Sequence, residues 1–306
     1  MKKGIVIKST GSFYTVRISE DEELACSIRG RLRTKGIRST NPVAVGDWVD
    51  VEEDKDGCVI THIHERKNYL IRKSTNLSKE SHIIASNIDQ AVIIITISHP
   101  ETSAVFIDRF LATCEAYTIR AILIFNKIDI YNEQEQAELE ELIGLYEHIG
   151  YDCYAVSAKE NTNIGEVKDI FQDKTTVLSG ISGVGKSSLV NRIEPGLNLK
   201  TGTISTTHNT GKHTTTFAEM FPLSGGGFII DTPGIRSFGM IDMKKEEISH
   251  YFPEIFKYSK DCRFHNCTHL HEPGCAVIEA IQEGHIHEKR YFSYISMMEE
   301  DGEKYR

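Results

Sequence analysis

The first 66 residues alternate hydrophobic and polar positions over short distances. Their β-branched and aromatic residues fall into five runs, which turn signals such as Asn41-Pro42 and Asp56-Gly57 separate, at 4–9, 12–18, 23–30, 47–53 and 58–65. Five short strands without a helical period predict a small barrel over 1–66, of the OB type; an SH3-like barrel is the alternative that periodicity leaves open. We expect Trp48 in its core rather than as a stacking platform, because aromatic residues dominate small cores.

From about residue 88 the pattern changes to unbroken apolar runs that alternate with helical periods. The runs 91–97 and 121–125 have the composition of strands that are covered on both faces of a parallel sheet. Helices are predicted at 104–116 and 133–148, and further strands at 152–156, 174–179, 217–222 and 227–231. This alternation predicts an α/β domain over 67–240. From about 243 the chain becomes helical and rich in Cys and His, which predicts a third domain over 241–306.

A glycine-rich loop follows the predicted strand at 174–179. It matches G-x-x-x-x-G-K-[ST], a pattern whose backbone N–H groups cradle phosphates while the lysine reaches the β- and γ-phosphates and the hydroxyl binds Mg²⁺. A glycine-rich turn without a ligand is the alternative, which the strand before and the helix after make the weaker one. The predicted ligands are Gly180, Ile181, Ser182, Gly183, Val184, Gly185, Lys186, Ser187 and Ser188.

Two upstream segments predict that the base is guanine. A carboxylate at Asp129 can accept from guanine N1–H and from the exocyclic amine, a donor pair that adenine lacks. The segment Ser157-Ala158-Lys159 follows 28 residues later and would close over the base with backbone amides. The predicted base-binding residues are Asn126, Lys127, Ile128, Asp129, Ser157, Ala158 and Lys159. An ATPase would require this combination to be a coincidence.

Two downstream segments resemble the switches of a GTPase. Asp231 ends a predicted strand and suits Mg²⁺, and the Gly234 amide suits the γ-phosphate. Among three consecutive threonines, Thr215 is the one we expect to bind Mg²⁺. Many GTPases place a water-orienting glutamine after this glycine, but here the residue is Ile235, which cannot orient water.

The order of these elements along the chain is guanine, guanine, phosphate, first switch, second switch. An ordinary GTPase begins with the phosphate loop, so the order predicts a circularly permuted GTPase domain. In this arrangement the second switch, at 231–240, leads directly into the C-terminal segment.

Three of the seven cysteines cluster near the C-terminus. Cys262, Cys267 and Cys275 lie among the histidines at 265, 269 and 271. Three thiolates and one imidazole make a closed tetrahedral site, which is typical of structural rather than catalytic zinc. Reduced cysteines without a metal are the alternative. The spacing alone does not decide which histidine is the fourth ligand.

The charge is unevenly distributed. The chain of 306 residues has a net charge of −9, which as an average argues against nucleic acid. The segment 29–38 nevertheless contains no acid and could dock on phosphate through Arg29, Arg31, Arg33, Lys35 and Arg38. No apolar stretch has the length of a signal peptide or a membrane span, so we expect a cytoplasmic protein without a membrane partner.

Together these motifs resemble the RsgA (YjeQ) family of ribosome-associated, circularly permuted GTPases over essentially the whole chain. The resemblance implies an OB fold, a permuted GTPase domain, a zinc-binding helical domain with His269 as the fourth ligand, and GTP hydrolysis stimulated by the small ribosomal subunit during its late maturation. His213 matches the family's basic-His-Thr-Thr-Thr pattern and is the candidate catalytic residue; an idle switch-loop histidine is the alternative, and His208 is a weaker candidate.

We expect a monomer that uses GTP with Mg²⁺, one structural Zn²⁺, and the small subunit with its rRNA as partner. A second hypothesis is an RNA-binding assembly module whose nucleotide only sets its conformation, with negligible turnover. The absence of glutamine at Ile235 keeps this second hypothesis open.

Overall fold

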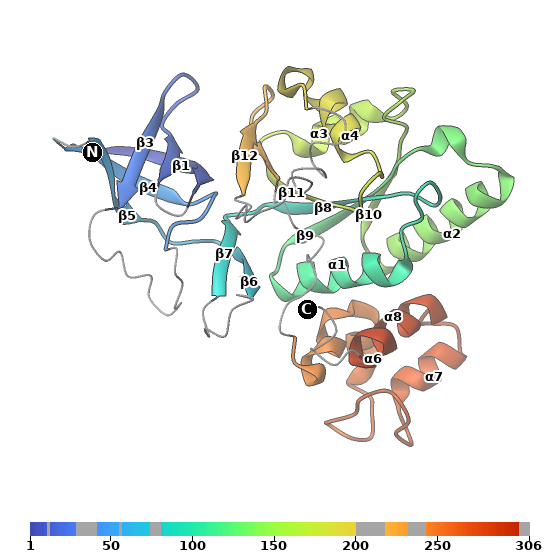
Figure 1. Cartoon of the computed structure of the whole chain (residues 1–306). Helices are drawn as coiled ribbons and strands as arrows, with labels where there is room; N and C mark the ends of the chain where they lie inside the picture. The colour runs from blue at the N-terminus through green and yellow to red at the C-terminus, as the bar shows by residue number, and fades with distance from the viewer. Residues whose placement is uncertain are drawn as a thin grey trace, which may run out of the picture.

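The computed structural model describes residues 1–10, 13–28, 42–54, 57–73, 81–199, 218–231 and 243–299. Figure 1 shows a β-barrel at the N-terminus, a central sheet with helices, and a C-terminal group of helices that lies below α1 (Ala104–Ala116). In the described residues, no helix is both long and apolar enough to cross a membrane.

The N-terminal strands close into a barrel, as predicted. Along the barrel the strands follow the order β1-β2-β3-β5-β4, and β4 pairs again with β1. All neighbouring pairs are antiparallel except β3 and β5. The strands are β1 (Lys2–Ser9), β2 (Tyr14–Arg17), β3 (Glu23–Ile28), β4 (Trp48–Asp54) and β5 (Gly57–Ile63).

The prediction that Trp48 lies in the barrel core is wrong. Val49 and Val51 of β4 are buried, and because side chains alternate across a strand, Trp48 faces outward. Its side chain is 42% exposed, and the Lys3 ammonium lies 5.3 Å from the ring centroid.

The central sheet has the strand order β10-β9-β8-β11-β13-β12. All neighbours are parallel except β12 and β13, which are antiparallel. The strands are β8 (Gln90–Ile95), β9 (Arg120–Phe125), β10 (Asp152–Ala155), β11 (Thr175–Ser179), β12 (Glu219–Pro222) and β13 (Phe228–Asp231). Beside α1, the helices are α2 (Glu133–Ile149), α3 (Ile164–Phe171) and α4 (Lys186–Ile193), with 3₁₀ turns η1 (Ile128–Ile130) and η2 (Pro195–Leu197).

This strand order confirms the circular permutation. Numbering from the phosphate-loop strand gives β11, β12, β13, β8, β9 and β10 the positions 1 to 6, and the spatial order becomes 2-3-1-4-5-6. The cut therefore falls between β13 and β8, the two strands on either side of β11. Because parallel strands end at one edge, the carboxyl ends of β8, β9, β10, β11 and β13 lie at the same edge of the sheet.

Local sequence explains the helices. Ser103 caps α1 by accepting from the Phe106 amide, and Asn132 forms a capping box with Glu135 at the start of α2. The helix α2 ends at Gly150, whose φ of 113° favours glycine.

A hairpin and a short helix were not predicted. A hairpin of β6 (Tyr69–Lys73) and β7 (Ser81–Ser86) connects the barrel to the central sheet. The connection is held by Asp47, which is fully buried and accepts two hydrogen bonds of 2.6 Å from the Arg66 guanidinium and one from Ser86. The short helix α3 was also missed, although Ile164, Val167 and Phe171 give it a buried face.

The C-terminal helices form a core of their own. They are η4 (Lys245–Tyr251), α6 (Pro253–Ser259), α7 (Ala276–Gln282) and α8 (Glu288–Glu299). Phe252, Ile255, Val277 and Tyr294 lie in this core, and Ala112 of α1 packs into it. The helical prediction for this region is confirmed, and α1 is shared between it and the central sheet.

Candidate nucleotide site and metal centre

The phosphate loop connects β11 to α4 at the carboxyl edge of the sheet. Gly180 and Gly185 have φ values of 136° and 96°, which favour glycine. Both positions also exclude a side chain, because a Cβ at Gly180 would lie 2.6 Å from the Ile94 carbonyl oxygen and one at Gly185 would lie 2.4 Å from Asn126 Nδ2. The second contact links the guanine and phosphate motifs. The Asn126 side chain occupies the space next to residue 185, so this position of the phosphate loop must be glycine.

Lys186 reaches back over this loop. Its ammonium donates hydrogen bonds of 2.7 Å to the carbonyl oxygens of Gly180 and Ile181. Ser187, next along α4, is 7% exposed at the N-terminal end of the helix. A lysine that folds over the glycine-rich loop can bind phosphate, and a hydroxyl at the helix N-terminus can bind Mg²⁺.

Asn126 joins the three nucleotide loops. Its side chain is buried, donates to the Val184 carbonyl oxygen of the phosphate loop at 2.8 Å, and accepts from the Ala158 amide at 3.0 Å. Tyr131 fixes the same loop from behind, because its hydroxyl donates to the Asn126 carbonyl oxygen at 2.5 Å and accepts from the Ile97 amide at 3.0 Å. The sequence-predicted loops are therefore assembled through Asn126.

The second predicted base contact, Asp129, is oriented by the third loop. The Ser157 hydroxyl donates to Asp129 Oδ1 at 2.6 Å and accepts from the Glu160 amide at 3.0 Å. The Lys159 ammonium lies 3.7 Å from Asp129 Oδ2. Ser157 thus holds a carboxylate in place, in addition to the closing role that its motif predicts.

Lys127 extends toward the loop that precedes α1. Its ammonium donates to the His99 carbonyl oxygen at 2.5 Å. Partial burial lowers the pKa of Lys127, although the negative charge of Asp129 acts to raise it. Pro100 follows His99 and reaches the phosphate loop, where a Cβ on Gly183 would lie 3.3 Å from its Cδ. The loop before α1 therefore contacts both the guanine and the phosphate loops.

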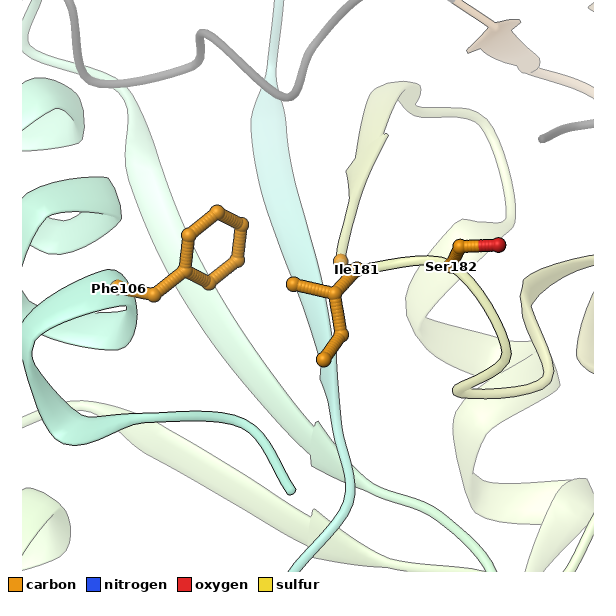
Figure 2. Close-up of a pocket in the computed structure, with 4 residues that line it drawn as sticks. Phe106, Ile181 and Ser182 are labelled. Carbon is orange, nitrogen blue, oxygen red and sulfur yellow. The ribbon is translucent and has the colours of Figure 1, made fainter. Parts of the chain in front are cut away.

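A pocket of about 320 Å³ borders the phosphate loop. Figure 2 shows the Phe106 ring, from the first turn of α1, facing Ile181 across it, while Ser182 points away. Gly180 completes the lining. The volume lies at the lower end of the range for small-molecule sites.

The C-terminal cluster brings together the four residues that the sequence and the family resemblance predict. The ligand atoms of Cys262, Cys267, His269 and Cys275 all lie within 4.8 Å of one another. Tetrahedral zinc, with Zn–S of about 2.3 Å and Zn–N of about 2.1 Å, separates two sulfurs by about 3.8 Å and a sulfur from a nitrogen by about 3.6 Å. The observed Cys262–Cys275 sulfur distance is 3.9 Å, and His269 Nδ1 lies 3.6 Å and 3.5 Å from these two sulfurs. The cluster therefore fits a tetrahedral ion of zinc size.

The backbone around His269 is held by side chains outside the cluster. His269 is 2% exposed, and burial lowers its pKa, which favours the neutral imidazole that metals bind. Its carbonyl oxygen accepts from the Tyr291 hydroxyl at 2.6 Å. Glu272 accepts from the amides of Thr268 and Leu270. Burial raises the pKa of Glu272, but hydrogen bonds from the Thr268 hydroxyl and from amides that include those of Thr268 and His271 outweigh it and lower this pKa to about 2.

The comparisons with known proteins agree with this geometry. The family model described as RsgA GTPase matches residues 63–241, and the model described as RsgA N-terminal domain matches residues 3–59. The chain belongs to the RsgA family. Similar relatives within the family include the small ribosomal subunit biogenesis GTPase RsgA 2 of Bacteroides thetaiotaomicron and RsgA of Phocaeicola vulgatus, 57% and 56% identical over 306 residues, with 99% of each chain covered.

Solved structures of RsgA relatives have the same fold. The crystal structure of YjeQ from Thermotoga maritima matches with a TM-score of 0.78 at 33% identity, covering 97% of both chains. YloQ, described as a circularly permuted GTPase, matches with a TM-score of 0.73 at 33% identity, covering 97% of this chain and 94% of YloQ.

Several predicted RsgA site residues lie outside the described residues, and they remain predictions. They are the candidate catalytic His213, the switch residues Thr215 and Gly234, the side chain of Asp231, and the basic residues Arg29, Arg31, Arg33, Lys35 and Arg38.

Sequence reasoning missed residues that hold the site without a motif of their own. Arg192 of α4 donates to the carbonyl oxygens of Ala158 and Lys159 at 2.9 Å and 3.0 Å, and so ties the third nucleotide loop to the phosphate-loop helix. Tyr131 could have been noticed two residues after Asp129, but nothing in the sequence indicates Arg192.

Proposed function

We propose that this protein hydrolyses GTP to GDP and phosphate, and that it acts in the late maturation of the small ribosomal subunit, from which GTP hydrolysis releases it. One observation carries the proposal: the chain is 57% identical over 306 residues to a relative named as a small ribosomal subunit biogenesis GTPase. The assembly of three nucleotide loops through Asn126 supports it independently.

The proposed mechanism assigns one task to each loop. The phosphate-loop amides and Lys186 bind the phosphates, and Asp129, oriented by Ser157, reads guanine. Ser187, Thr215 and Asp231 would hold Mg²⁺, which neutralises the charge on the β- and γ-phosphates when bound. The Gly234 amide would contact the γ-phosphate, and His213 would orient the attacking water, since Ile235 cannot.

The C-terminal cluster is proposed to hold one structural Zn²⁺. Four protein ligands fill a tetrahedral site, so no position remains for a substrate. The domain limits are proposed at 1–66, 67–240 and 241–306.

The partner is proposed to be the small subunit through its rRNA. The basic segment 29–38 offers five cations and no acid on a protein of net charge −9, so the contact would be local rather than a property of the whole surface. The protein is proposed to be a cytoplasmic monomer.

The test is phosphate release from GTP with and without purified small subunits. We expect slow release alone and faster release with subunits, and loss of both in Lys186→Ala, which lacks the phosphate-binding cation. A rate near zero in both conditions, with GTP still bound, would favour the alternative of an RNA-binding assembly module with a conformational nucleotide.

A further inference from the structure

The largest fully buried side chain of the described residues is a charged one, Arg290 of α8. Its guanidinium donates to both carboxylate oxygens of Glu254, at 2.6 Å and 3.3 Å, and to Asp108 Oδ1 at 2.6 Å. The guanidinium carbon lies 4.5 Å from the centroid of the Phe252 ring. A buried charge is costly unless it is paired, so the guanidinium fixes Glu254 and Asp108 relative to each other, although Asp108 Oδ2 has no hydrogen-bond partner in the described residues.

The network crosses between two parts of the molecule. Arg290, Glu254 and Phe252 belong to the C-terminal helices, whereas Asp108 belongs to α1. Asp108 is fully buried and also accepts from the Tyr146 hydroxyl of α2 at 2.9 Å. Figure 1 shows α8 below α1, on the side away from the sheet. The C-terminal helices therefore hold α1 through a charge rather than through apolar packing alone.

A second, exposed ion pair lies at the rim of the same interface. Lys289 donates to Glu141 of α2 at 2.7 Å, and Glu141 is about half exposed. Exposed pairs contribute little energy, so this rim contact provides a matched control for the buried one.

Along α1, Asp108 lies two positions after a residue that borders the phosphate loop. Phe106, in the first turn of α1, faces Ile181 of the phosphate loop (Figure 2). The loop immediately before α1 carries Pro100 against Gly183 and the His99 carbonyl oxygen that accepts from Lys127. A shift of the start of α1 would therefore move groups that contact both the phosphate loop and the guanine loop.

We propose that Arg290 is a positioning residue for the nucleotide site: by holding Asp108, it sets the start of α1 and with it the phosphate and guanine loops. The C-terminal metal domain is thereby coupled to nucleotide binding through α1, a route separate from the chain connection at 232–242. The proposal rests on the nucleotide site proposed above.

The test uses full-length Arg290→Met, with Asp108→Asn as a nearly isosteric second variant and Glu141→Gln as the rim control. Dissociation constants for GDP and for IDP, which lacks the exocyclic amine, are measured well below each variant's melting temperature, together with bound zinc. For both buried-network variants we expect weaker GDP binding by about two- to thirtyfold, the range of measured coupling between packed sites, and a smaller ratio of IDP to GDP dissociation constants. Zinc content stays at the wild-type value, and Glu141→Gln resembles the wild type.

A purely structural role would lower the melting temperature and leave the IDP-to-GDP ratio unchanged. If Arg290→Met does not fold, Asp108→Asn decides the question, because it removes one charge without changing volume. Unchanged GDP affinity and an unchanged ratio in a folded variant would overturn the proposal. Wild-type protein that binds no guanine nucleotide would refute the proposed function and this inference together, whereas normal wild-type binding with unaffected variants refutes only the inference.

Discussion

The nucleotide site and the metal centre are built in opposite ways. The three nucleotide loops are separated by 28 and 21 residues along the chain, yet they extend from buried strands and are joined by hydrogen bonds of Asn126, Ser157 and Arg192. The metal ligands lie within residues 262–275, next to α6 and α7, helices of seven residues each. Helices this short are not stable alone, and three thiolates next to one imidazole repel one another without a cation, so these four side chains need an ion to remain together.

This difference indicates which interactions stabilise each region. The described nucleotide loops extend from a sheet whose strands β8 and β9 are almost wholly buried, so the sheet holds these loops in place without a ligand. The metal centre is expected to gain its folding free energy from the ion. Loss of metal should therefore damage one region far more than the other.

The largest expected effect comes from Cys267→Ala, which removes one metal ligand. Zinc should be lost and the C-terminal helices should unfold, since metal binding and folding are coupled in such sites. Subunit-stimulated hydrolysis should be lost. GTP binding should persist, because every proposed nucleotide ligand lies between residues 126 and 234. Its affinity should fall by no more than in Arg290→Met.

Zinc content, circular dichroism and stimulated phosphate release check this prediction. Cys58→Ala, a half-buried barrel cysteine outside the cluster, is the matched control and should keep its zinc. Normal stimulation of zinc-free protein would show that the two regions are not coupled.

A smaller effect is expected inside the nucleotide site, from Arg192→Gln. Its two hydrogen bonds to the third nucleotide loop come from a charged but partly exposed group, so their loss should cost about 1 kcal/mol, or about fivefold in GDP affinity. Titration with a fluorescent GDP analogue measures this. Arg120→Gln, whose guanidinium pairs with Asp152 and not with a nucleotide loop, should bind normally. Equal losses of GDP affinity in the two variants would contradict the prediction that Arg192 supports the nucleotide site.

The sequence predicted the parts of both regions that depend on local chemistry. Gly180 and Gly185 are required by the backbone path itself, so a linear motif contains them. The order of the motifs along the chain was sufficient to predict that the GTPase domain is circularly permuted. Trp48 was misplaced because hydrophobicity alone does not give the phase of alternation, which Val49 and Val51 set in β4. Arg192 and Arg290 could not be found, because their partners are distant in sequence and meet them only in the folded chain.

A further prediction, outside both regions, concerns the basic segment. Replacing Arg31, Arg33 and Lys35 with glutamine should weaken subunit binding and reduce its salt dependence, the slope falling by about 0.7 to 0.9 per lost phosphate contact. Binding measured over a series of salt concentrations checks this, with Lys168→Gln on α3 as a control. A slope equal to the wild-type value would place the RNA-binding surface elsewhere.

The central claim is that residues 126–187 form a guanine-nucleotide site in permuted order, and Asp129→Asn tests it most directly. The amide can donate to the 2-oxo group of xanthine, where the carboxylate of the wild type accepts from the guanine amine. Competition between GTP and xanthosine triphosphate for the variant is the measurement. We predict that preference moves from GTP to xanthosine triphosphate while the fold is unchanged. An unaltered preference for GTP in the folded variant would contradict the assignment.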